Sequence, residues 1–146
     1  MLENILYGFG VMVLCLFLQS LLFVSVIIFY NKHLGWVKMP GFGPRLILIN
    51  GVMLLLVIGN LLQISMWAIL FQHLDEFATY HEAFYHSAVN FSTLGYGDIV
   101  MSADRRLLGP LESINGVIMI GVSTAVLMAA IQDTIKKSLS IINKKV

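Results

Sequence analysis

The sequence predicts an all-α membrane protein with three transmembrane helices, and three observations support this fold class. Of its 146 residues, 58% are hydrophobic and 12% are charged, about half the charged share of an average soluble domain. Residues 4–31, 46–74 and 113–132 contain no Asp, Glu, Lys or Arg. Each stretch can cross a bilayer, because roughly 20 apolar residues in a helix span the hydrocarbon core. A fourth uncharged stretch, residues 83–97, is too short and too polar to span.

Composition and motifs exclude several classes of function. A net charge of +1 at pH 7 provides no basic field for nucleic acid, so we expect no nucleic-acid partner. Cys15 is the single cysteine, which excludes an intrachain disulfide and a cysteine metal cage. The sequence contains no recognisable nucleophile–base pair, phosphate-binding loop or zinc motif. We therefore expect a protein that is not an enzyme and has no cofactor.

The first transmembrane helix is expected over residues 4–30. The residues before it include an acidic residue, Glu3, and no basic one, and the apolar stretch is longer than that of a secretory signal. We therefore interpret residues 1–31 as a retained helix. A linker follows over residues 32–45, and a second helix is expected over 46–72. The linker is broken by Pro40, Gly41, Gly43 and Pro44.

The charges outside the helices predict the orientation in the cell membrane. The linker carries three basic residues and no acidic one, and the tail, residues 133–146, carries four lysines and one aspartate. The segment between the second and third helices carries six acidic residues and two arginines. Because basic loops stay cytoplasmic, we expect the linker and the tail inside the cell and the N-terminus outside. The opposite orientation would place seven lysines and arginines outside.

Five polar side chains in the first two helices are expected to face neighbouring helices, because amides in lipid need hydrogen-bond partners. They are Gln19, Asn50, Asn60, Gln63 and Ser65. A direct role in transport is the alternative interpretation. Because interhelical polar contacts are common in membrane bundles, the packing interpretation is favoured.

The segment between the second and third helices contains a short helix of its own. Thr79 and Glu82 form a capping box, so a helix should begin at Tyr80 and run to about Phe91. It would be only about 18 Å long and would enter the membrane part of the way. Two glycines around an aromatic residue then prevent a regular helix from continuing. Non-helical backbone at membrane depth must be buried in protein or line a water-filled path.

After this short helix the chain reads Thr93-Leu94-Gly95-Tyr96-Gly97-Asp98. This run, between a capped half-helix and a spanning helix, resembles the pore loop and selectivity filter of tetrameric potassium channels. The resemblance covers a pore domain of residues 46–132, and the first helix lies outside it. It implies a re-entrant pore helix and a filter between helices two and three. An ion that loses its hydration shell needs rings of carbonyl oxygens, so four identical chains are expected around the pore.

The resemblance assigns roles to the residues of the loop. The carbonyls of Thr93, Leu94, Gly95 and Tyr96 would bind K⁺, and Gly95 and Gly97 would permit the backbone twist that points them inward. Tyr96 would brace the loop from outside, and Asp98 would close its outer mouth.

Side chains on the short helix depart from the usual pattern of the family. Tyr85 and His86 stand where many members have tryptophans, Val89 stands where some have a glutamate, and Leu94 replaces Val or Ile. These departures are expected to affect filter rigidity and inactivation, but not the choice of ion.

The third helix, over residues 111–132, is expected to line an inner cavity. Gly121, Ala125 and Ala129 recur every four residues, which indicates either cavity space or close helix packing. Gly116 and Gly121 are candidate hinges, although glycine is common in membrane helices. Neither of the first two helices carries an arginine or lysine ladder, which excludes a voltage sensor of the usual kind.

These observations predict a homotetramer in membrane lipid that conducts K⁺ passively. A weakly selective cation channel and a non-conducting structural membrane subunit are the alternatives. His73, His81 and His86 are expected on the outer side, where a proton-sensing role competes with a structural one.

Overall fold

The computed structural model describes residues 1–39 and 42–143, apart from the side chains of residues 38 and 141–143. Pro40 and Gly41 of the linker, and Lys144 and Lys145 of the tail, lie outside the described residues. Within these ranges every regular element is helical, which confirms the predicted fold class. In chain order the elements are α1 (Leu2–Lys32), a short 3₁₀ helix η1 (Leu34–Lys38), α2 (Gly43–His73), α3 (Tyr80–Phe91) and α4 (Leu108–Asn143).

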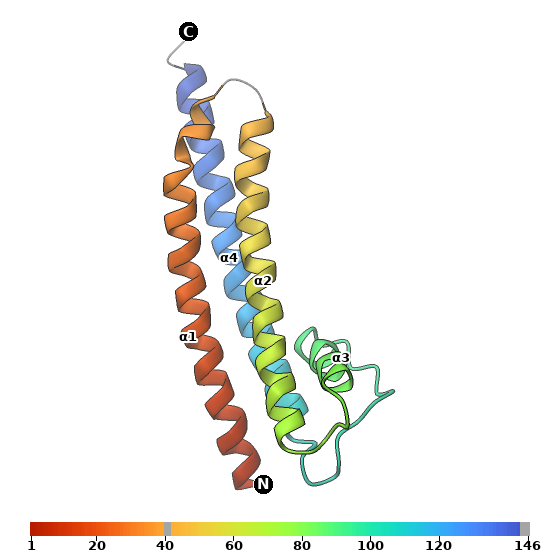
Figure 1. Cartoon of the computed structure of the whole chain (residues 1–146). Helices are drawn as coiled ribbons and strands as arrows, with labels where there is room; N and C mark the ends of the chain where they lie inside the picture. The colour runs from red at the N-terminus through yellow and green to blue at the C-terminus, as the bar shows by residue number, and fades with distance from the viewer. Residues whose placement is uncertain (40–41, 144–146) are drawn as a thin grey trace.

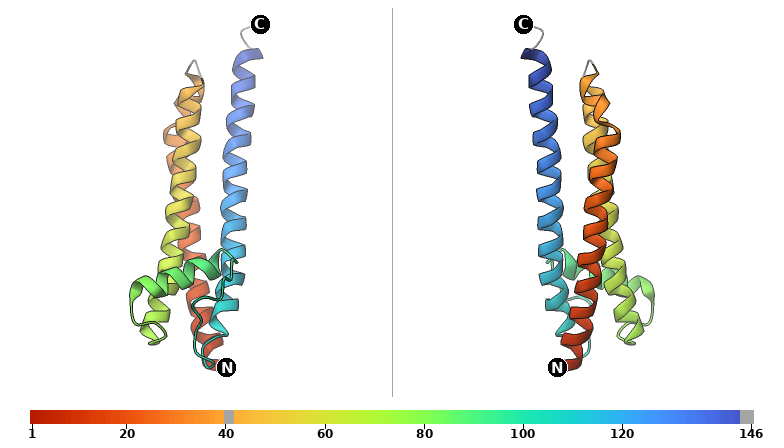
Figure 2. Two further views of the ribbon diagram at one scale, coloured as in Figure 1. Left: turned by 90° about the vertical axis from the view of Figure 1, so that its right-hand side faces the viewer. Right: turned by 90° about the vertical axis from the view of Figure 1, so that its left-hand side faces the viewer.

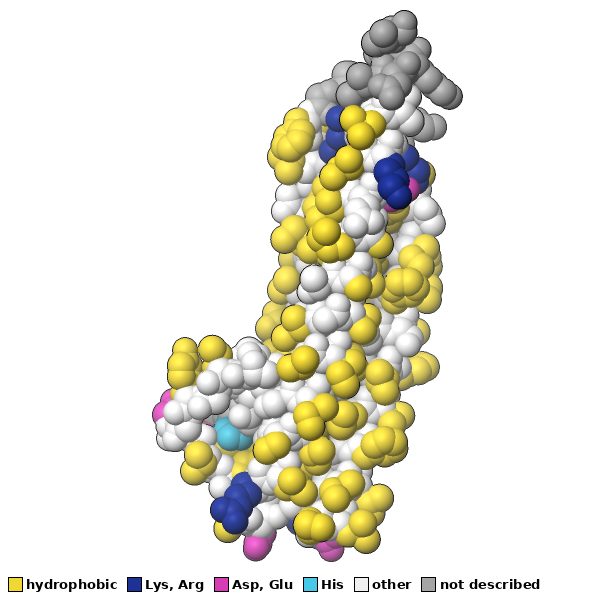
Figure 3. Space-filling view, turned by 180° about the vertical axis from the view of Figure 1, so that it is seen from behind, with side chains coloured by type: hydrophobic (Ala, Val, Ile, Leu, Met, Phe, Trp, Pro, Cys, Tyr) yellow, Lys and Arg dark blue, Asp and Glu magenta, His cyan; other side chains and the backbone are white. Residues whose placement is uncertain are grey.

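Three of these helices, α1, α2 and α4, are long and apolar enough to cross a membrane. They run side by side along the length of the molecule, and the N-terminus and the end of α4 lie at opposite ends (Figures 1 and 2). The short α3 lies beside the end that holds the N-terminus and projects from the bundle (Figure 1). Hydrophobic side chains cover the middle of the bundle, and the charged side chains on this face lie toward its two ends (Figure 3). The chain is thus a multi-pass membrane protein.

The last helix continues beyond the expected span of residues 111–132 into the tail, for which the sequence leaves two arrangements open, a continuation of the helix or a segment on the inner leaflet. α4 begins at Leu108, so that Pro110 lies in its first turn, and it continues past Gln132 to Asn143. The chain after Gln132 becomes polar, but it contains no proline or glycine that would end a helix. An ion pair between Asp133 and Lys137, one turn apart, lies on this extension. The described part of the predicted tail therefore continues α4.

The main apolar core lies at the end of the bundle where α3 docks. The fully buried side chains there are those of Trp67 and Phe71 of α2, Phe91 of α3 and Leu108 of α4. Met119, about three turns further along α4, is buried in the same cluster. Aromatic rings contact one another across this cluster, with the centroids of Trp67 and Phe71 5.8 Å apart. This core fixes α3 against α2 and α4, so it also fixes the loop that follows α3.

Polar side chains connect the three long helices near their middle. Gln63 of α2 donates to Gln19 of α1 over 2.7 Å, and Gln19 donates to Ser123 of α4 over 3.1 Å. Asn60 of α2 accepts from the same serine. The other two polar residues expected at helix contacts behave differently. Asn50 and Ser65 donate to carbonyls of their own helix, which satisfies them without a neighbour.

Candidate functional site

The short helix α3 forms from a local signal and ends where the sequence predicts. Thr79 is its N-cap, and the Thr79 hydroxyl accepts from the backbone N–H of Glu82 over 3.2 Å. The helix runs from Tyr80 to Phe91, so its length is about 18 Å at helical rise. It is therefore too short to span a bilayer.

The loop after α3 has an alternating backbone conformation. Thr93, Gly95 and Gly97 have φ values of 60°, 59° and 74°, whereas Leu94 and Tyr96 between them do not have positive φ. Alternating right- and left-handed residues bring successive N–H groups to one side of the chain. Thr93 lacks the freedom of glycine, and a left-handed conformation of this kind costs about 1–3 kcal/mol. Strain held in this way clusters at functional sites.

The start of the loop is fastened to the last turn of α3. The N–H groups of Leu94 and Gly95 both point to the carbonyl of Val89, at 2.9 and 3.4 Å, and Thr93 donates to the carbonyl of Asn90 over 2.9 Å. Val89 itself is 7% exposed. Because the carbonyl oxygen of Val89 accepts both N–H groups, Val89 connects the helix to the loop through its backbone.

The loop lies on the surface of the single chain. All six residues from Thr93 to Asp98 are exposed, including the large apolar surfaces of Leu94 and Tyr96, at 58% and 67%. No group of three or more His, Cys, Asp or Glu that could hold a metal occurs in the described ranges.

Tyr85 of α3 holds the far end of the loop. Its hydroxyl donates to Asp98 Oδ2 over 2.7 Å, and Asp98 Oδ1 accepts from the N–H of Ile99 over 3.1 Å. The hydrogen bond from Tyr85 holds the pKa of Asp98 below its usual range and raises the pKa of Tyr85. Tyr96, which was expected to brace the loop, makes no side-chain hydrogen bond in the described chain. Within one chain, the Tyr85–Asp98 pair thus connects the far end of the loop to α3, as the backbone bonds to Val89 and Asn90 connect its start.

His86 lies behind the loop, and both nitrogens of its ring are hydrogen-bonded. Nδ1 lies 3.0 Å from the carbonyl oxygen of Ile99, and Nε2 lies 2.8 Å from the side-chain nitrogen of Asn90. With Asn90 in this orientation, the ring donates from Nδ1 and accepts at Nε2, which is a neutral tautomer. The rings of Phe71 and Phe77 pack against it. Burial lowers the pKa of His86, and the carbonyl of Ile99 opposes that shift only in part.

The glycine and alanine residues of α4 divide into two groups. A Cβ added at Gly116 would lie 2.1 Å from the carbonyl oxygen of Phe91, so this glycine permits close contact between α4 and the end of α3. Gly121 has open space around it, and Ala125 and Ala129 are exposed. Gly116 therefore acts as a packing contact, and the other three form an uncovered small-residue stripe.

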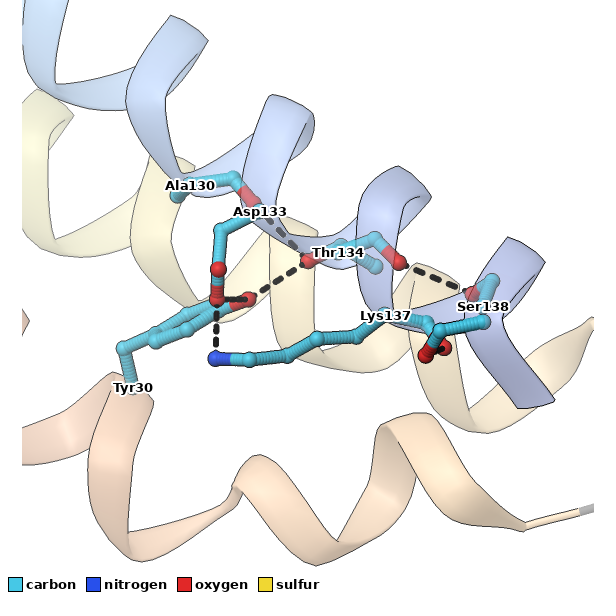
Figure 4. A network of polar contacts seen from close by, with 7 residues as sticks. Tyr30, Ala130, Asp133, Thr134, Lys137 and Ser138 are labelled. Atoms are coloured by element: carbon cyan, nitrogen blue, oxygen red, sulfur yellow. Dashed lines mark hydrogen bonds and ion pairs between the residues drawn. The ribbon is translucent and has the colours of Figure 1, made fainter.

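Two polar contacts between helices, one far from the site and one beside it, had not been predicted from the sequence. At the far end of α4, Tyr30 of α1 donates to Asp133 over 2.8 Å and contacts Thr134 at 2.9 Å, and Lys137 pairs with the same aspartate (Figure 4). This cluster joins α1 to the end of α4. Tyr30 is separated from the other three residues by about a hundred residues in the chain, so no local sequence pattern reveals the cluster.

The second missed contact is buried beside α3. Ser87 of α3 is hydrogen-bonded to Glu112 of α4, and both residues are fully enclosed. The one sequence signal for this contact is the position of Glu112, an acidic residue directly before the uncharged stretch of residues 113–132.

Comparison with known proteins bears on the segment that contains α3 and its loop. A protein-family model described as "Ion channel" matches residues 49–133, more than half of the chain. The match covers most of α2, all of α3 and the loop, and α4 as far as Asp133. No curated protein and no solved structure was found to match the chain.

Proposed function

Because the chain belongs to this family of ion channels, we propose that it is a subunit of a homotetrameric channel that conducts K⁺ passively down its electrochemical gradient. The observation that carries the proposal is the alternating backbone of residues 93–97, with positive φ at every second residue. This alternation turns successive carbonyls to one side, as a filter that replaces the hydration shell of K⁺ requires. The proposal includes no cofactor and no enzymatic activity.

In this proposal the loop is the selectivity filter, and each residue has a distinct role. The carbonyls of Thr93, Leu94, Gly95 and Tyr96 are the K⁺ ligands. Gly97 supplies the last left-handed turn, and the Tyr85–Asp98 bond, His86 and Val89 support the filter from α3. The small-residue stripe of Gly121, Ala125 and Ala129 faces the inner cavity.

The exposure of the loop supports assembly into a tetramer. One chain offers carbonyls on one side only, so an ion needs further copies around it to complete its shell. Four identical loops around a symmetry axis provide rings of oxygens and also cover the apolar surfaces of Leu94 and Tyr96. Membrane lipid would surround the assembly, and α1 would be an additional transmembrane helix outside the pore domain of residues 46–132.

Flux measurements on purified protein in liposomes test the proposal. We expect K⁺ flux that exceeds Na⁺ flux by at least tenfold, together with a tetrameric particle. Equal fluxes of K⁺ and Na⁺ would identify a weakly selective cation channel. Absence of flux in a monomeric or dimeric particle would identify a structural membrane subunit.

The orientation is a separate prediction that rests on the positive-inside rule. We expect the N-terminus outside and the C-terminus in the cytoplasm, because the basic linker and tail should stay inside. With Cys15 replaced, a cysteine introduced at position 2 should react with an impermeant thiol reagent in intact cells, and one at position 146 should not. The reverse labelling pattern would contradict this orientation.

Acid sensitivity is expected from the surroundings of His86. At neutral pH its lowered pKa keeps the ring neutral, and the stability that this neutral ring contributes is lost as the pH falls from about 6.5 through the lowered value. Protonation at Nε2 would break the hydrogen bond from Asn90 and place a charge behind the filter. External acid should therefore reduce K⁺ flux severalfold.

The histidine variants separate this mechanism from a general effect of acid. His86→Gln should flatten the acid response and preserve selectivity. His73→Gln and His81→Gln, at exposed positions, should leave the response unchanged. An acid response that persists in His86→Gln would show that this histidine has a structural role only.

A further inference from the structure

Glu112 is an acidic side chain enclosed inside the apolar part of the fold. It lies on α4 within a candidate membrane span and is 0% exposed. Its Oε1 is hydrogen-bonded to the hydroxyl of Ser87, and its Oε2 has no partner within the described ranges. The ion pairs found among the described residues, Arg105–Glu3 and Lys137–Asp133, do not include it. An ionised carboxylate here would be buried without a counter-ion, which is strongly unfavourable.

The hydrogen bonds around Ser87 indicate where the proton lies. The Ser87 hydroxyl oxygen is 2.8 Å from the carbonyl oxygen of Ile64 on α2 and also contacts Oε1 of Glu112. A hydroxyl has one proton, and a carbonyl can only accept, so Ser87 donates to Ile64. The contact with Glu112 then requires a proton on the carboxyl group, which donates to the serine oxygen. If Glu112 were ionised, one of the two oxygen–oxygen contacts would contain no proton.

We propose that Glu112 is protonated in the folded protein and is a positioning residue that fastens α3 to α4. The hydrogen bonds from Glu112 to Ser87 and from Ser87 to the carbonyl of Ile64 connect α4, α3 and α2 at one buried point. If Glu112 is a neutral carboxylic acid, its unpartnered Oε2 carries no charge, and burying it costs less free energy than burying an unpaired carboxylate oxygen.

Two neighbouring contacts extend this attachment toward the filter. Ser113, next to Glu112, donates to the carbonyl of Asn90 over 2.9 Å, and Gly116, one turn later, lies against the backbone of Phe91. The three α4 residues thus hold the last turn of α3, from which the loop at Thr93 begins. A displacement of this turn would move the filter carbonyls.

The protonation of Glu112 can be tested without ion flux. The infrared difference spectrum between the parent protein and Glu112→Gln, recorded in liposomes at neutral pH, should show loss of the C=O band of a carboxylic acid. Glu3→Gln is the matched control, because the Glu3 side chain is exposed and its replacement should leave the carboxylic-acid band of Glu112 in place. Carboxylate bands in the Glu112→Gln difference spectrum would overturn the proposal.

The positioning role is tested by selectivity, and this part rests on the proposed function. Glu112→Gln keeps a donor and an acceptor, so its K⁺/Na⁺ flux ratio should stay within about twofold of the parent value. Glu112→Leu removes the hydrogen bond between residue 112 and Ser87 while Ser87 keeps its bond to Ile64, and loss of a buried hydrogen bond of this kind should lower the ratio by about tenfold. Ser87→Ala removes the central hydroxyl and should act in the same direction, which provides a second variant if Glu112→Leu does not assemble.

The outcomes separate this inference from the proposed function. A parent protein without K⁺-selective flux would contradict the proposed function, whereas the infrared result would still decide the state of Glu112. A selective parent whose ratio is unchanged in both Glu112→Leu and Ser87→Ala would overturn the positioning role. A ratio that falls equally in Glu112→Gln and Glu112→Leu would overturn it as well.

Discussion

Replacing Gly95 with alanine is expected to lower the K⁺/Na⁺ flux ratio by at least tenfold. Gly95 has a φ of +59°, and a Cβ in this left-handed region costs roughly 1–2 kcal/mol in each subunit. Nothing lies within 4 Å of the position that the new Cβ would occupy, so the effect comes from the backbone angle and not from a clash. In a tetramer the cost is repeated four times, because each filter ring takes one carbonyl from every chain.

The control for this variant is a glycine without special geometry. Gly10 of α1 has open space around its Cβ position and no positive φ, so Gly10→Ala should leave the flux ratio unchanged. Gly97→Ala, at a φ of +74°, should behave like Gly95→Ala. Unchanged ratios in both filter variants would refute the assignment of residues 93–97 as the filter.

Gly116→Ala is expected to destabilise the protein by about 1–3 kcal/mol and to reduce conduction. The added Cβ would lie 2.1 Å from the carbonyl oxygen of Phe91 and 2.8 Å from its carbonyl carbon, so the backbone of α3 or α4 must move. The displaced element is the last turn of α3, from which the loop of residues 93–98 begins. Thermal unfolding in detergent, followed by flux in liposomes, measures both effects.

Gly121→Ala is the matched variant on the same helix. Gly121 has nothing within 4 Å of its Cβ position, and alanine has a better helix propensity than glycine by up to about 1 kcal/mol. The unfolding temperature should therefore stay the same or rise. Equal destabilisation by Gly116→Ala and Gly121→Ala would show that the contact with Phe91 has no special importance and would favour the hinge interpretation for both glycines.

Features with a local physical cause could be predicted from the sequence. The three spans follow from the length of the uncharged stretches, because the bilayer requires a minimum apolar length. The start of α3 at Tyr80 follows from the Thr79 cap, and its end follows from the glycines of the loop. The sequence left open whether the tail continues the last helix, since a fall in hydrophobicity ends a membrane span but does not by itself end a helix, and the structure shows that α4 runs on to Asn143.

The candidate site was predicted as a stretch of chain, but its supports were not. The motif at residues 93–98 located the loop, and the left-handed angles at Gly95 and Gly97 agree with the freedom that glycine provides. The partner of Asp98, in contrast, is Tyr85, and the partners of His86 are Ile99 and Asn90. These pairings depend on how the loop folds back on α3, which no spacing in the sequence determines.

The sequence by itself therefore determined the membrane fold, the position of the short helix and the glycine-containing loop, because each depends on neighbouring residues and on the bilayer. The tertiary structure alone decided which residues hold that loop in place. Glu112 with Ser87 and Gly116 with Phe91 each join α4 to α3 between residues that are 25 apart in the chain. The contact of Tyr30 with Asp133, which joins α1 to the far end of α4 across 103 residues, was decided in the same way. Such contacts depend on the rotation and spacing of packed helices, and α1, α2 and α4 are too uniformly apolar for their sequences to reveal which face meets which neighbour.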